Sequence, residues 1–122
     1  MLIEPARVED LKECADCFAA AFQKDPATTY FFPGAWETRK PLIHEFFGLL
    51  LAARIQLNEP ALVVRKNHRI LGVVHGYRTI RPCWPALLAQ RWTAFESRQT
   101  GITERLKVYD TITDECAPLL PH

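Results

Sequence analysis

Two short apolar segments joined by a polar link constrain the fold of this chain more than any other feature. Residues 61–65 and 70–77 are rich in β-branched side chains, and the link 66–69 is polar throughout. This pattern predicts an antiparallel β-hairpin. Both segments are nearly continuous in apolar residues, which is typical of a sheet buried on both faces beneath helices.

Apolar residues with helical spacing flank this hairpin on both sides. A first strand is expected at residues 2–5, followed by a helix at 8–22 whose apolar face recurs every three or four residues. A second long helix is predicted to start at Trp36 or Thr38, after the turn at Pro33 and Gly34, and to end at Gln56. Gly101 separates two later helices, each with one apolar face: Trp84, Leu87, Leu88, Trp92 and Phe95 in the first; Ile102, Leu106, Tyr109, Ile112 and Cys116 in the second. The sequence therefore predicts an α+β fold in a single domain, residues 1–122.

Composition and charge narrow the classes of function. The chain is 48% hydrophobic and 24% charged, which is enough apolar content to bury a core. Its 15 Lys and Arg residues are interspersed with 14 Asp and Glu residues, so no basic face for a nucleic acid is expected. No apolar run reaches the roughly 20 residues of a membrane span, and no secretory signal is recognisable at Met1. We expect a cytoplasmic protein with free thiols.

Two familiar catalytic or metal-binding patterns are incomplete in this sequence. Cys14 and Cys17 have the spacing of half a zinc site, but no matching second pair follows, so no metal is expected. They also fall inside a predicted helix, whereas a redox pair normally opens one. His75 stands alone in a strand, and Ser97 is the sole serine, with no nucleophile-elbow pattern around it. No catalytic residue is assigned.

The order of strand, helix, short helix, helix, hairpin and helices, together with several segments, resembles a known family. The segments are residues 3–6, 9–11, 17–22, Asp25-Pro26 with 30–33, and 63–73. They are similar to the N-terminal half of a GNAT-superfamily N-acetyltransferase. The resemblance implies a mixed sheet splayed to admit acetyl-CoA, whose pyrophosphate sits on a loop of pattern Gln/Arg-x-x-Gly-x-Gly/Ala after the fourth strand.

This chain departs from the family pattern at the cofactor loop. The nearest match, residues 98–103, has Arg98 and Gly101 in place but Thr103 where Gly or Ala is expected, and it follows a predicted helix. We therefore expect a turn between helices, and assign no cofactor-binding residue. The chain ends where the family would begin its fourth strand, so we expect a truncated domain that is inactive alone.

The resemblance also implies where an acceptor amine would bind. In the family the loop between the first two helices lines the acceptor side, which corresponds to residues 24–32 here. Asp25, Tyr30 and Phe31 are the candidate substrate-binding residues: Asp25 could attract an amine and the Tyr30 hydroxyl could meet a polar group. Each also has an ordinary structural role open to it, in a turn or in the core.

Two alternatives to the transferase fragment stay open. A truncated domain would leave an open sheet edge near Tyr77 and exposed apolar surface, which favours a homodimer or a partner chain. In that case the chain is an interaction module that docks through this edge or through a helix bearing Trp84 and Trp92. The other alternative is a ligand-binding α+β domain with an apolar pocket lined by Tyr30, Phe31 and Phe46.

Overall fold

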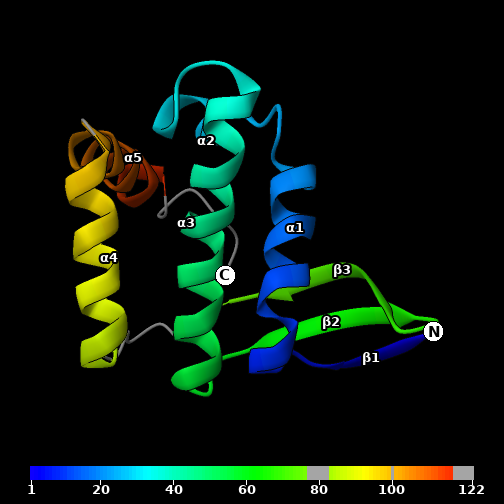
Figure 1. Ribbon diagram of the computed structural model, residues 1–122. Helices are drawn as coiled ribbons and strands as arrows, with labels where there is room; N and C mark the ends of the chain where they lie inside the picture. Colours follow the sequence, from blue (N-terminus) through cyan, green and yellow to red (C-terminus); the bar gives the residue numbers. More distant parts are fainter. Residues whose placement is uncertain (77–82, 100, 117–122) are drawn as a thin grey trace.

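Helices pack on one face of a three-stranded antiparallel sheet, so the α+β prediction is confirmed (Figure 1). This computed structural model describes residues 1–76, 83–99 and 101–116, the last without the side chains of 110 and 112–116. The elements in chain order are β1 (Leu2–Pro5), a 3-10 turn (Val8–Asp10), α1 (Leu11–Ala21), α2 (Pro26–Phe31), α3 (Trp36–Gln56), β2 (Ala61–Lys66), β3 (Arg69–His75), α4 (Ala86–Arg98) and α5 (Ile102–Cys116).

The first predicted helix, residues 8–22, begins as a 3-10 turn and becomes α-helical only at Leu11. The change follows from Asp10, whose carboxylate accepts the backbone N–H of Arg7 at 2.9 Å. The other oxygen of Asp10 accepts from Arg65 on β2 at 2.9 Å, and Arg65 also donates to Glu4 on β1 at 2.7 Å. The buried Asp10 thus ties the start of α1 to two strands.

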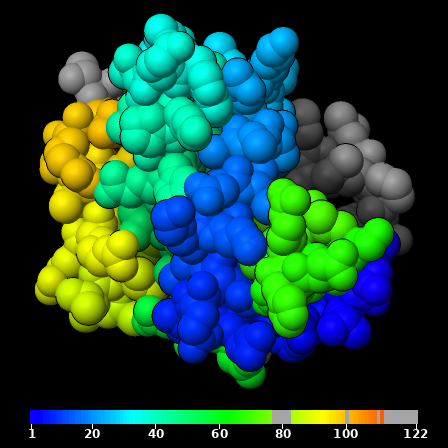
Figure 2. All heavy atoms as spheres, turned by 45° about the vertical axis from the view of Figure 1, so that its right-hand side comes forward, coloured from blue at the N-terminus to red at the C-terminus, as the bar shows by residue number. Residues whose placement is uncertain are grey.

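The sheet has the order β1-β2-β3, and a two-residue turn joins its last two strands. Asn67 and His68 form this turn with φ values of 52° and 66°. Positive φ at both central residues is characteristic of the hairpin turn whose twist matches that of the flanking strands. A register shift between Val64 and Arg65 interrupts the β2–β3 ladder. Figure 2 shows β1 in dark blue and the hairpin in green together on one side of the molecule.

Only one face of the sheet is covered by the described residues. Val63 and Ile70 point to α1 and α3 and are buried. On the opposite face, Leu62 and Val74 are cross-strand partners, and Val74 is 68% exposed. The prediction of burial on both faces is therefore wrong for this part of the chain. A continuous apolar pattern in a strand shows that both faces of the sheet could pack against apolar residues. It does not show that such residues are present on both faces.

Helix α3 is central and lies between α1 and α4 (Figure 1). Most of its residues are buried or partly buried, as expected of a helix enclosed by others. One side of α3 packs with α2, α4 and α5 and includes the buried Ile43, Phe46 and Leu49. Its other side meets α1 and the sheet, where Leu51 joins Cys14 of α1 in a second cluster. Two apolar cores therefore share one helix.

The apolar face predicted for α4 is correct except at Leu87. Leu88 and Phe95 are buried, whereas Leu87 is 71% exposed. Adjacent helical residues differ by about 100° around the axis, so Leu87 and Leu88 cannot both face the core. Trp84 and Trp92 are partly buried against the core, with their ring centroids 5.5 Å apart. In the described parts of the chain, no helix combines the length and apolarity that crossing a membrane requires.

Candidate functional site

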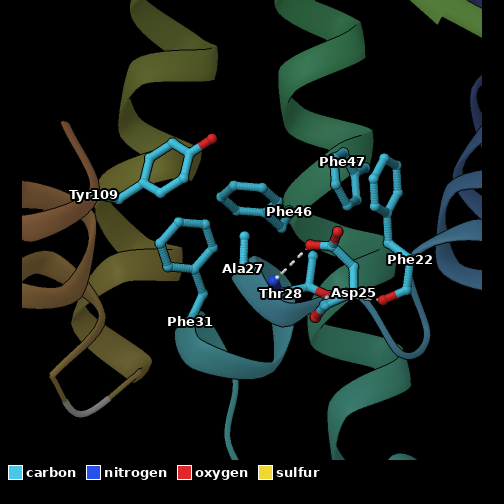
Figure 3. A pocket seen from close by; sticks show the side chains of 8 residues that line it. All are labelled: Phe22, Asp25, Ala27, Thr28, Phe31, Phe46, Phe47 and Tyr109. Carbon is cyan, nitrogen blue, oxygen red and sulfur yellow. Dashed lines mark hydrogen bonds between the residues drawn. The ribbon is translucent and has the colours of Figure 1, made fainter. Parts of the chain in front are cut away.

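A cavity of about 330 Å³ opens where the turn after α1 meets α3 and α5 (Figure 3). Its lining is mostly aromatic, with one carboxylate and two hydroxyls, those of Thr28 and Tyr109. The lining residues are Phe22, Asp25, Ala27, Thr28, Phe31, Phe46, Phe47 and Tyr109. They come from segments far apart in the sequence, so only the folded chain forms this site.

The start of α2 forms one side of the cavity, and an N-cap at Asp25 sets where this helix begins. Asp25 precedes the helix with extended backbone, and its Oδ2 accepts the Thr28 N–H at 3.1 Å. Pro26 occupies the first helical position, where its missing N–H costs nothing. The Thr28 hydroxyl donates to the carbonyl of Phe22 at 2.7 Å, which ties the end of α1 to α2.

A buried arginine holds the other end of α2. Arg39 on α3 donates from Nε to the Phe32 carbonyl at 2.8 Å and from Nη2 to the Thr29 hydroxyl at 3.1 Å. Its guanidinium also lies 5.7 Å from the ring centre of Trp36, within the range of a cation–π contact. Both ends of this short helix are thus fixed, and Asp25 and Phe31 are held toward the cavity.

Aromatic rings form two walls. On one side Phe22 stacks on Phe47 with centroids 4.9 Å apart. On the other side Phe31 meets Tyr109 edge to face at 5.2 Å and lies 6.1 Å from Phe46. Figure 3 shows the carboxylate of Asp25 between these two groups of rings. The arrangement places one negative charge among aromatic rings.

The wall nearest the C-terminal helix depends on how α5 docks. Arg105 of α5 donates from Nε to the backbone carbonyl of Phe31 at 3.1 Å, and Tyr109 packs against the ring of the same residue. Ile102 at the start of α5 is buried in the core with Phe95 of α4. The docking of α5 therefore completes the cavity.

Two of the three predicted substrate-binding residues line the cavity. Asp25 and Phe31 do, whereas Tyr30 is 44% exposed and lies outside the lining, with its ring centre 5.9 Å from that of Phe31. Phe46, named in the ligand-binding alternative, also lines it. The sequence did not point to three further lining residues: Phe22, Phe47 and Tyr109. Thr28 lies within residues 24–32, the range that the resemblance places on the acceptor side. No feature of the sequence indicates that Tyr109 lies near Asp25.

The described part of residues 98–103 lies where α4 ends and α5 begins. Arg98 is the last residue of α4 and Ile102 is the first residue of α5, while Gly101 before it has φ of 79°. The N–H of Ile102 is used within that turn, donating to the Gln99 carbonyl at 3.3 Å. A Cβ at Gly101 would lie 2.7 Å from the Arg105 guanidinium, so a side chain fills the approach to this backbone. This turn lies between two helices, whereas the cofactor loop of the family follows a strand.

Cys14, Cys17, Cys83 and His75 lie away from the cavity lining. Burial raises the pKa of Cys14 to about 11, and burial also raises the pKa of Cys17, which donates weakly to the Ile70 carbonyl. A raised pKa disfavours the nucleophilic thiolate. Burial, with the charge of Arg54, lowers the pKa of His75, whose ring packs edge-on against Phe18. Within the described residues, no cluster of His, Cys, Asp or Glu could hold a metal ion.

Comparison of the chain with protein-family models, with curated proteins and with solved structures returned no match.

Proposed function

We propose that this chain is the acceptor-binding part of a GNAT-type N-acetyltransferase and that the cavity holds the acceptor amine. The observation that carries the proposal is the position of the cavity. It is built on the turn between the first two helices, where the resemblance implies the acceptor side, and Asp25 provides a carboxylate there. A carboxylate at this place suits a protonated amine before transfer.

The arrangement of the sheet also supports the proposal. Helices α1 to α3 separate β1 from the β2–β3 hairpin, and the three strands pair antiparallel, in the order that the resemblance implies. Among the described residues, β3 pairs on one edge only, and the face bearing Ile3, Leu62 and Val74 is exposed. Both surfaces suit the further strands and helices of the larger family fold.

The proposal assigns acceptor binding to the described residues and no step of acetyl transfer. Acetyl-CoA supplies the acetyl group in the family, where its pyrophosphate sits on a loop that follows a strand. The turn at Gly101 instead joins two helices. We therefore expect the 122-residue chain to bind no acetyl-CoA and to transfer no acetyl group by itself.

Two measurements test this proposal. The first is the reading frame beyond His122: a strand followed by a Gln/Arg-x-x-Gly-x-Gly/Ala segment supports it, and a stop codon there contradicts it. The second is calorimetry of the folded chain with acetyl-CoA, with coenzyme A as control. Saturable binding of acetyl-CoA at micromolar affinity would overturn the proposal that this chain lacks the cofactor site. A titration without heat of binding supports the proposal.

A second candidate is an interaction module, which the exposed sheet face favours. Leu71 and Val74 are 54% and 68% exposed on the hairpin. If this face binds another chain, sedimentation velocity should show association of the protein that the substitution Val74→Lys abolishes. Val8→Lys is the matched control, since Val8 is similarly exposed but lies outside the strands. A monomer at all concentrations, with no partner recovered, counts against this module.

A further inference from the structure

We infer that the cavity is selective for the ammonium group of a small amine carrying an aromatic or branched aliphatic substituent. Asp25 binds the ammonium, and the rings of the two walls enclose the substituent. This inference rests on the proposed function in taking the cavity as the acceptor site, and it deepens that proposal by naming the class of acceptor.

The charge of the cavity comes from one residue. Among the lining residues that the structure describes, Asp25 alone carries a full charge at neutral pH. Its Oδ2 accepts the Thr28 N–H, and no described residue donates to its Oδ1. A carboxylate has acceptor sites on both oxygens, so capping α2 leaves Asp25 able to receive an ammonium N–H. The electrostatic preference of the cavity is therefore for a single positive charge.

The aromatic walls reinforce this preference and define the rest of the ligand. An ammonium near the face of Phe or Tyr is attracted by the ring quadrupole, and five aromatic residues line the cavity: Phe22, Phe31, Phe46, Phe47 and Tyr109. An apolar substituent would displace water from these rings, which is favourable in proportion to the area buried. The walls thus suit an aryl or alkyl group attached to the amine.

The same lining disfavours the other common kinds of amine. A polyamine would bring further positive charges among rings with no second carboxylate to meet them. An amino sugar or a peptide would bring hydroxyl or amide groups. The described lining has two hydroxyls to meet them, on Thr28 and Tyr109, and that of Thr28 already donates to the Phe22 carbonyl. A volume near 330 Å³ lies at the lower end of the range of roughly 300–1,000 Å³ for small-molecule sites. A ligand with one ring fits this description best.

The test is a titration of the 122-residue chain with 2-phenylethylamine, its neutral analogue 2-phenylethanol and the polyamine spermidine, followed by ligand-observed NMR and calorimetry. We expect 2-phenylethylamine to bind most tightly. Asp25→Asn is the informative variant, because Asn caps a helix as well as Asp does and so preserves α2 while removing the charge. It should weaken 2-phenylethylamine on the order of 10- to 100-fold, as expected for a hydrogen bond to a charged group.

Two controls separate loss of charge from loss of fold. Binding of 2-phenylethanol should be the same in Asp25→Asn as in the parent chain, which shows that the cavity is intact. Glu37→Gln removes an exposed acid at the start of α3, outside the cavity, and should change neither ligand. Tyr109→Leu should weaken both ligands, because it removes a ring and no charge.

The outcomes distinguish this inference from the proposed function. Equal affinity of Asp25→Asn and the parent chain for 2-phenylethylamine overturns the role of Asp25, and tighter binding of spermidine overturns the apolar specificity. In the second case an amine still binds, so the proposed function survives without this inference. If 2-phenylethylamine binds in an Asp25-dependent way but a stop codon follows His122, the inferred class of ligand is supported and the proposed transferase function is overturned.

Discussion

Removing the carboxylate of Glu59 should destabilise the fold strongly, because it faces a buried arginine. Arg54, in the last turn of α3, donates from Nη1 to Glu59 Oε1 at 3.1 Å, and the two side chains are only 7% and 1% exposed. The backbone N–H of Glu59 also donates to the Arg54 carbonyl at 2.8 Å. The pair therefore fixes the end of α3 beside the start of β2.

The magnitude follows from burial. Exposed ion pairs contribute about 0–1 kcal/mol, but removing one partner of a buried pair costs about 3–5 kcal/mol, because a desolvated charge loses its counterion. Glu59→Ala should lie in that range. Glu59→Gln keeps an oxygen acceptor and should cost less, about 1.5–3 kcal/mol. Domains of this size are stable by roughly 5–15 kcal/mol, so either change is a large fraction of the total.

Urea unfolding followed by circular dichroism measures these differences as shifts of the midpoint at constant slope. The double variant Arg54→Met, Glu59→Leu is the companion measurement, since replacing a whole buried pair by apolar residues is often neutral. We expect it to be more stable than Glu59→Ala. If Glu59→Ala unfolds within 1 kcal/mol of the parent chain, the pair is solvated in solution and the reasoning is refuted.

Three further predictions follow from burial. Phe95→Ala should cost about 3–5 kcal/mol of unfolding free energy, while Leu87→Ala on the same helix should stay within about 0.5 kcal/mol; similar losses in thermal unfolding would contradict the assigned face of α4. Iodoacetamide should alkylate the exposed Cys83 well before the buried Cys14, whose pKa is raised to about 11, and equal labelling by mass spectrometry would count against that burial. Because the pKa of His75 is lowered in the folded chain, the unfolded chain binds a proton at this imidazole at higher pH than the folded chain does. The free energy of unfolding should therefore fall as the pH drops below about 6.5, and His75→Leu should reduce this dependence. An unchanged pH profile would show that the imidazole is solvated.

Local signals in the sequence predicted most elements of the fold. The strand predicted at 2–5 matches β1, and the long helix predicted from Trp36 or Thr38 to Gln56 matches α3, which begins at the first of these two positions. The hairpin was predictable because apolar strands flank a polar link, and Asn67 tolerates the positive φ that the turn demands. Asp25 before Pro26, for which a turn was the structural role considered, is the N-cap of α2. These features depend on a few neighbouring residues, so no knowledge of distant contacts was needed.

Features set by rotation around a helix or by distant segments could not be predicted in this way. Tyr30 and Phe31 are adjacent on α2, and only the packing of α3 and α5 decides that Phe31 faces the cavity while Tyr30 faces solvent. Tyr109 is on α5, whose place beside α2 is a tertiary contact with no signal in the local pattern. The exposed sheet face is a further case, since an apolar strand gives no information on what covers it.

We expect the docking of α5 to complete the cavity later in folding than the packing of α1, α2 and α3, which form the rest of it and are here called its scaffold. The turn at Asp25 and the packing of Phe22 on Phe47 join elements that are close in sequence. Arg105 and Tyr109 contact Phe31 across a long stretch of chain that includes the whole hairpin. Contacts that close a long loop form late, because the entropy of closure is lost before the contact compensates it. The scaffold can therefore be native while the cavity still lacks a wall, and hydrogen exchange in α5 should slow when a ligand occupies the cavity.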